Sequence, residues 1–172
     1  MIKKKNLVGI VMGSDSDLPV MKEAAQMLER FNIPFELEIS SAHRSPERTI
    51  KYAREAVGRG LKILVVGAGG AAHLAGVIAA ITTLPVIGVP MDTKALKGLD
   101  SLFSIVQMPK GIPVATLAIG NAGAANAGIL CAEILALESP EIRKKLEVFK
   151  EELKKSVIKK SNKLKKTGYK KY

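Results

Sequence analysis

Residues 7–17 read LVGIVMGSDSD, an apolar run that ends abruptly in glycine, serine and aspartate. From Val20 to Leu28 the apolar residues recur at helical spacing, so this stretch predicts a strand, a tight loop and a helix. A second apolar run, at 63–66, leads into the glycine-rich sequence 67–70. Uninterrupted apolar strands of this kind are typical of parallel sheets that are covered on both faces.

The rest of the chain alternates in the same way. Further strands are expected at 34–40, 85–89 and 114–119, and further helices at 46–60, from the glycine-rich stretch to about 82, at 100–106, at 121–137 and from 140 onward. In the strand at 34–40, Phe35, Leu37 and Ile39 alternate with polar residues, which predicts one buried face. Alternating strands and helices imply parallel pairing. The pattern predicts an α/β fold, a three-layer αβα sandwich with a flavodoxin-like parallel sheet of order 2-1-3-4-5.

The length of 172 residues suits one catalytic domain, predicted at 1–155 and including the start of the last helix, with a lysine-rich C-terminal tail at 156–172. The net charge of +11 is concentrated near this end, because residues 141–172 hold 13 Lys or Arg against 4 Asp or Glu. A lysine-rich end of this kind, with no interleaved aromatic platform, more often keeps a chain in solution than reads bases. We therefore expect no nucleic-acid partner.

Cysteine usage and hydropathy bear on the compartment. Cys131 is the only cysteine, which excludes an intramolecular disulfide and favours a reducing setting. No apolar stretch reaches about 20 unbroken residues, and the run at 7–12 is too short for a secretory leader. We expect a cytoplasmic protein without a membrane partner.

Three strand ends carry candidate chemistry. In a sheet of this order ligands bind beyond the carboxyl ends of the strands, where the winding direction reverses. The loop at 13–17 offers hydroxyls and amides at a helix start, which suits phosphate, although an ordinary helix cap has the same composition. The next loop places His43 beside Arg44. Histidine can exchange protons near neutral pH and arginine can bind phosphate through two bonds, yet both also occur as plain surface residues.

The third loop, residues 67–74, has almost no side chains, so a flat ring could approach its backbone. Gly67, Gly69 and Ala72 also fit the dinucleotide fingerprint, with Asp92 at the spacing of a ribose-binding acid. A nicotinamide or flavin enzyme is thus an alternative. Against it, the fingerprint follows the third strand, and the chain is too short for a second substrate domain.

Other catalytic sets are missing from the sequence. It contains no Gly-x-Ser-x-Gly elbow, Walker lysine loop or His-Glu-x-x-His helix, and two histidines with one cysteine are poor material for a catalytic metal site. We expect neither a metal nor a cofactor, and a small-molecule substrate.

Five blocks, at 13–17, 41–46, 67–74, 100–109 and 118–126, together resemble the N5-carboxyaminoimidazole ribonucleotide mutase family of purine biosynthesis. The resemblance implies a homo-octamer that reversibly moves carboxylate from the exocyclic nitrogen to carbon 4 of aminoimidazole ribonucleotide, without ATP, metal or biotin. A sister group carboxylates aminoimidazole ribonucleotide with free carbon dioxide and is the nearest alternative. The sequence Arg44-Ser45-Pro46 favours the mutase.

The resemblance also assigns roles by matching position. His43 would be the catalytic acid and base, Ser14 and Arg44 would hold the phosphate, and Asp17 the ribose. The other substrate-binding residues that it implies are Gly13, Ser16, Ser41, Ala42, Gly69, Gly70, Ala71, His73 and Leu74. His73 is expected to support the site rather than to react. Two departures from the family pattern, Ala75 for proline and Met91-Asp92-Thr93 for Val-Gln-Ser, fall at a helix start and at the expected pocket rim.

Overall fold

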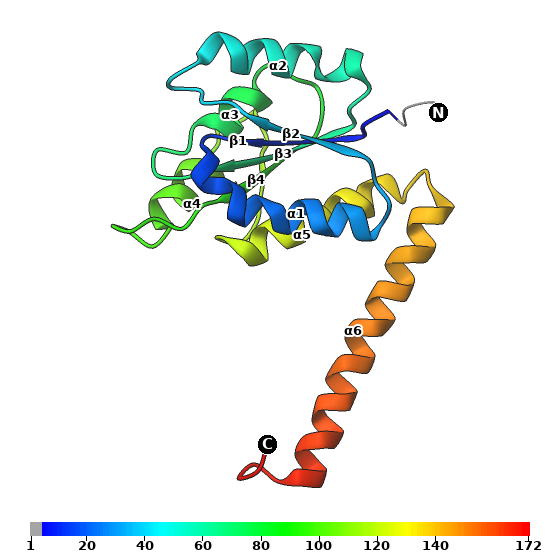
Figure 1. The fold of residues 1–172 in the computed structure, drawn as a ribbon. Helices are drawn as coiled ribbons and strands as arrows, with labels where there is room; N and C mark the ends of the chain where they lie inside the picture. Colours follow the sequence, from blue (N-terminus) through cyan, green and yellow to red (C-terminus); the bar gives the residue numbers. More distant parts are fainter. Residues whose placement is uncertain (1–4) are drawn as a thin grey trace. The chain divides into compact units, whose positions relative to one another are not determined.

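The computed structural model describes residues 5–172 and contains one five-stranded parallel sheet (Figure 1). The strands are β1 (Val8–Met12), β2 (Phe35–Ile39), β3 (Ile63–Ala68), β4 (Val86–Pro90) and β5 (Ala115–Thr116). Their order, β2-β1-β3-β4-β5, confirms the predicted flavodoxin-like arrangement. The winding reverses between β1 and β3. Residues 1–4 of the predicted domain lie outside the described residues.

Helices cover both faces of the sheet (Figure 1). The helices of the described residues are the short 3-10 helix η1 (Asp15–Asp17), α1 (Leu18–Arg30), α2 (Pro46–Arg59), α3 (Leu74–Ala79), α4 (Leu99–Val106), α5 (Asn121–Leu135) and, in a separate unit of the chain, α6 (Pro140–Thr167). Ala53 of α2, Ile78 of α3 and Ile105 of α4 share one buried cluster with Val66 of β3. Helices α1 and α5 lie on the opposite face (Figure 1). The three-layer sandwich is therefore confirmed.

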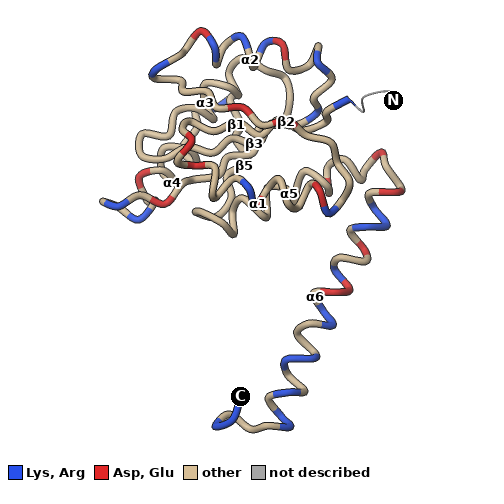
Figure 2. The backbone as a smooth tube through the Cα atoms, viewed as in Figure 1, with Lys and Arg blue, Asp and Glu red and all other residues tan. Residues whose placement is uncertain are grey.

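The chain divides into two compact units, one ending at Cys131 and the other beginning at Ala132. Within the second unit, α6 continues to Thr167 and so includes most of the predicted lysine-rich tail, because lysine is a good helix former and the first helix breaker is Gly168. Lys and Arg recur along the helix (Figure 2). A division of the chain at residue 155 stays a prediction.

Strand β2 is not buried as its alternation predicts. Leu37 and Ile39 are each 47% exposed, while Glu36 and Glu38, the polar residues between the apolar ones, are less exposed. The reason is that β2 is an edge strand whose polar face is covered by α2, where Arg48 donates to Glu38 through Nε at 2.8 Å. The apolar face of this strand is the freer one.

Two elements are shorter than expected. Helix α3 ends at Ala79 rather than near 82, and β5 has two residues rather than six. The polypeptide still follows the sheet edge after β5, because the Leu117 amide donates to the Gly88 carbonyl at 3.0 Å. Over residues 5–172, no helix is both long and apolar enough to cross a bilayer.

A polar cluster joins β2 to α2 away from the strand ends. The carboxylate of Glu36 accepts from the Tyr52 hydroxyl at 2.9 Å and from Nη2 of Arg59 at 3.1 Å. The Arg59 guanidinium also lies over the Tyr52 ring, 4.4 Å from its centroid. Burial, and then the bond to Glu36, raise the pKa of the Tyr52 hydroxyl, so it stays protonated and keeps donating.

Candidate functional site

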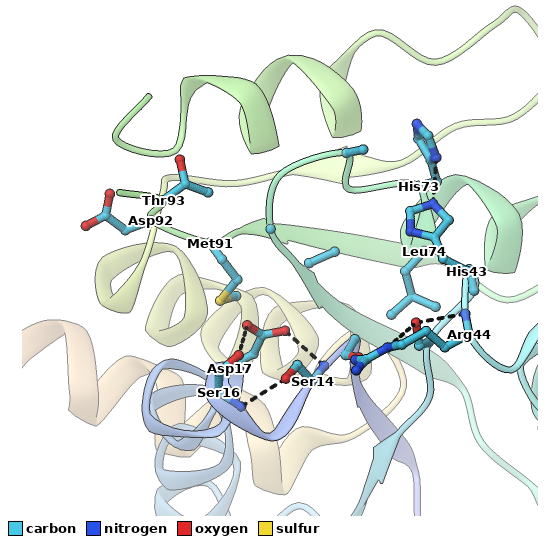
Figure 3. Close-up of a pocket in the computed structure, with 16 residues that line it drawn as sticks. Ser14, Ser16, Asp17, His43, Arg44, His73, Leu74, Met91, Asp92 and Thr93 are labelled. Carbon is cyan, nitrogen blue, oxygen red and sulfur yellow. Dashed lines mark hydrogen bonds between the residues drawn. The ribbon is translucent and has the colours of Figure 1, made fainter. Parts of the chain in front are cut away.

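The loop after β1 uses its donors within itself (Figure 3). The Ser16 amide donates to Oγ of Ser14 at 3.3 Å and to Oδ1 of Asp15 at 3.1 Å. In turn, the Ser14 amide donates to Oδ2 of Asp17 at 3.2 Å, which completes a capping box at the start of η1. Two amides and a serine hydroxyl therefore converge at a helix start, each already facing a carboxylate or hydroxyl oxygen of the same loop.

The loop after β2 turns tightly and extends an arginine toward the first loop. The Arg44 amide donates to Oγ of Ser41 at 3.2 Å, and the Ser45 amide donates to the Ser41 carbonyl at 2.8 Å. Nη2 of Arg44 donates to the carbonyl oxygen of Gly13 at 3.0 Å. This guanidinium therefore bridges the first two loops and brings a fixed positive charge beside the serine amides.

The third loop brings a second imidazole to the first. Nε2 of His43 lies 2.9 Å from Nδ1 of His73, with the rings nearly perpendicular at 89°. One of these nitrogens must donate the proton and the other must accept it, so the contact couples the tautomers of the two rings. Both side chains are exposed. His73 lies immediately before α3.

The three loops enclose one cavity of about 460 Å³, a size usual for small-molecule sites. Of the predicted site residues, those that line it are Gly13, Ser14, Ser16, Asp17, Ser41, Ala42, His43, Arg44, Gly69, Ala71, His73 and Leu74. Gly70 does not line it. Four further lining residues are Ala68, Met91, Asp92 and Thr93. The last three follow β4, which lies next to β3, so sheet order could have indicated them; sequence reasoning placed them only at the rim.

The surroundings of Asp17 shift the pKa of its carboxyl group. Partial burial raises the pKa of Asp17 above its usual 3.8, and the bonds from Ser14 and Ser16 offset this only in part. The folded state therefore binds this proton more tightly than the unfolded state does. As the pH rises from the pKa of Asp17 in the unfolded chain to its raised pKa in the folded protein, the free energy of unfolding falls. Above the folded-state pKa this destabilisation is fully present.

Replacing Asp17 by asparagine should therefore stabilise the free protein at neutral pH. The gain should stay below about 1 kcal/mol, because a half-exposed carboxylate is screened by water. It should shrink in acid, where the wild-type carboxyl is protonated. Urea unfolding of both proteins at about pH 7 and about pH 3 would measure this. An asparagine variant that is less stable at the higher pH would contradict the proposed desolvation of Asp17.

The donor set of the cavity limits its chemistry. Hydroxyls, amides and one guanidinium can hold an anion such as a phosphate, and a carboxylate can accept from sugar hydroxyls. The glycine- and alanine-rich wall leaves room for a flat ring near one imidazole. Within residues 5–172, no three His, Cys, Asp or Glu side chains group together as a metal site would require.

Known proteins are similar to this chain in sequence and in structure. The family model described as AIR carboxylase matches residues 7–156. An N5-carboxyaminoimidazole ribonucleotide mutase from Thermotoga maritima is 59% identical over 165 residues, which is 96% of this chain and 95% of that protein. A phosphoribosylaminoimidazole carboxylase from Candida glabrata is 55% identical over 98% of this chain, but only 29% of that protein is covered. The crystal structure of Treponema denticola PurE superposes with a TM-score of 0.83 at 28% identity, covering 93% of this chain and 99% of that one.

Proposed function

Because this chain belongs to the AIR carboxylase family, we propose that it is a mutase of purine biosynthesis that interconverts N5-carboxyaminoimidazole ribonucleotide and its 4-carboxy isomer. The observation that carries this function is the 59% identity to a mutase over almost the full length of both chains. The cavity supports it, because groups able to bind phosphate, a carboxylate able to accept from ribose hydroxyls and the His43 imidazole line the same space.

In the proposed binding mode, the nucleotide lies across the reversal point of the sheet. Ser14 and Arg44 hold the phosphate, and Asp17 accepts from the ribose hydroxyls. Ser16, Ser41 and Ala42 complete this wall. The base then reaches the third loop, where Gly69 and the residues up to Leu74 approach the ring and the carboxylate. Gly13 lines the same end of the cavity, and its carbonyl oxygen accepts from Arg44.

The proposed reaction needs one proton shuttle and no net proton uptake. Protonated His43 gives its proton to the exocyclic nitrogen as the bond from that nitrogen to the carboxylate breaks, which releases carbon dioxide and the free amine. Carbon 4 of the ring then forms a bond to the same carbon dioxide. Neutral His43 removes the proton from carbon 4, which restores the aromatic ring and the starting state of the enzyme.

Confinement explains how so few functional groups suffice. An electron-rich ring attacks carbon dioxide without a strong electrophilic catalyst if both are held in contact, since orientation alone can supply a large part of the barrier. Residues with small or no side chains, such as Gly69 and Ala71, let the backbone form a close wall around the departing carboxylate.

A label-transfer experiment tests the function. We expect purified protein to convert N5-carboxyaminoimidazole ribonucleotide labelled with ¹³C in the carboxylate into the 4-carboxy isomer with the label retained, even with excess unlabelled bicarbonate present. The direct carboxylase, which the Candida glabrata relative makes the second candidate, would dilute the label into the bicarbonate pool. Lack of conversion of N5-carboxyaminoimidazole ribonucleotide, with or without bicarbonate, would contradict the mutase function.

For the oligomeric state and the cellular compartment, we propose a cytoplasmic homo-octamer without a nucleic-acid or membrane partner. Exposed apolar side chains support association of subunits, on β2 and on and beside α4: Leu37, Ile39, Leu96, Leu99, Phe103 and Val106. Light scattering of the purified protein would measure its mass in solution, and a monomeric mass would contradict the octamer.

A further inference from the structure

Gly70, a predicted substrate contact, is bonded to helix α4 through its backbone. The Gly70 amide donates to Oγ of Ser101 at 2.9 Å, and the Ser104 hydroxyl donates to the Gly70 carbonyl oxygen at 3.2 Å. The two serines are one helical turn apart on the same face of α4. Gly70 itself has φ +68, a left-handed conformation that favours glycine.

These two bonds fix two different peptide groups. The amide of Gly70 belongs to the peptide that joins it to Gly69, and its carbonyl belongs to the peptide that joins it to Ala71. Both neighbours line the cavity although Gly70 does not. Each bond from α4 therefore sets the tilt of one peptide group that reaches the cavity wall.

The two serines do not hold Gly70 equally strongly. Ser101 is fully buried, with 0% exposure, so its bond to the Gly70 amide has no competition from water. Ser104 has a single hydroxyl proton, and it lies closer to the Asp100 carbonyl, at 2.7 Å, than to that of Gly70. Ser101 is therefore the stronger of the two contacts.

The same helix end also reaches the wall after β4. Oγ1 of Thr93 donates to Oδ1 of Asp100 at 2.8 Å and accepts from the Gly98 amide at 3.1 Å. Thr93 lines the cavity on the side away from His43 (Figure 3). The N-terminal part of α4 thus touches two walls of the cavity without entering it.

We propose that Ser101 is a positioning residue for the reaction: through Gly70 it holds the backbone of the third loop in the orientation that surrounds the carboxylate in transit. The proposal rests on the proposed mutase function. A wall made of backbone has no side-chain rotamers to lock, so its precision depends on what holds the peptide groups. The phosphate and ribose contacts come from other loops and do not depend on this bond.

The test compares Ser101→Ala with Tyr52→Phe, a control that also removes a sheltered hydroxyl bond but at the β2–α2 cluster. We expect Ser101→Ala to lower kcat by about 10- to 100-fold with KM changed less than about threefold, because misplacement at the reacting centre affects the transition state most. Exchange of the Gly70 amide hydrogen, followed by NMR, should accelerate. Tyr52→Phe should keep kcat and the exchange rate of the Gly70 amide at wild-type values, while losing about as much thermal stability as Ser101→Ala.

A Ser101→Ala protein with the kcat of Tyr52→Phe, or with unchanged exchange at Gly70, would overturn the proposal. If Ser101→Ala does not fold, Ser101→Cys, which keeps the size of the side chain but is only a weak acceptor for the Gly70 amide, should show the same changes, and a normal kcat there would overturn the proposal equally. Inactive wild-type protein would instead contradict the mutase function. The exchange measurement needs no turnover, so the two failures are distinguishable.

Discussion

Replacing His43 by asparagine is expected to lower the kcat of the isomerisation by about 10²- to 10⁴-fold, the usual contribution of a positioned acid and base. Asparagine can still hydrogen-bond to neighbours, but it cannot carry a proton between the exocyclic nitrogen and carbon 4. KM should change little, because the phosphate and ribose contacts come from other side chains. Steady-state kinetics in both directions would measure the two constants.

Thermal unfolding of the His43→Asn variant is the control for its kinetics. His43 is exposed and its imidazole contacts that of His73 rather than the core, so thermal unfolding should stay within a few degrees of wild type, the range of ordinary surface substitutions. A folded asparagine variant that turns over at the wild-type rate would remove the proposed role of His43.

The second large effect is expected from Arg44→Ala. Loss of a hydrogen-bonded charge typically costs about 1.5–3 kcal/mol, which corresponds to a rise in KM of roughly 10- to 150-fold. Arg44→Lys should recover only part of this, since lysine keeps the charge but not the planar fork that spans from the second loop to Gly13. Kinetics with the nucleotide substrate would measure both variants.

Arg48→Ala is the matched control. Arg48 lies in the first turn of α2, four residues after Arg44, with its guanidinium bound to Glu38, and it does not line the cavity. The variant loses the same charge close to the site, so a general electrostatic effect would raise KM for both arginines. An Arg44→Ala protein with no larger KM than Arg48→Ala would contradict the phosphate role.

Most of the fold follows from the sequence, because apolar runs such as 63–66 and the helical spacing after Asp17 are local patterns. The errors occur at the sheet edge. The alternation in β2 predicts a buried face with Leu37 and Ile39, yet burial of an edge strand depends on which neighbouring helix reaches it, and α2 covers the glutamates instead. The periodicity of a strand does not indicate which of its faces a helix will cover.

The sequence also predicts part of the candidate site. Loops at the carboxyl ends of neighbouring strands must meet, so Ser14, His43 and His73 could be expected together. The 2.9 Å contact between the imidazoles and the capture of Gly70 by α4 could not, because both join residues about 30 positions apart through side-chain geometry. Long-range hydrogen bonds of this kind need coordinates.

The capping box of the first loop makes ligand binding an exchange of partners. In the free protein the Ser16 amide faces the carboxylate of Asp15, and the Ser14 amide that of Asp17. An arriving phosphate must displace these resident anions before it can take their place. Inorganic phosphate alone should consequently compete poorly, and occupancy should depend on the sugar and the base contributing at the same time, which restricts the loop to whole nucleotides.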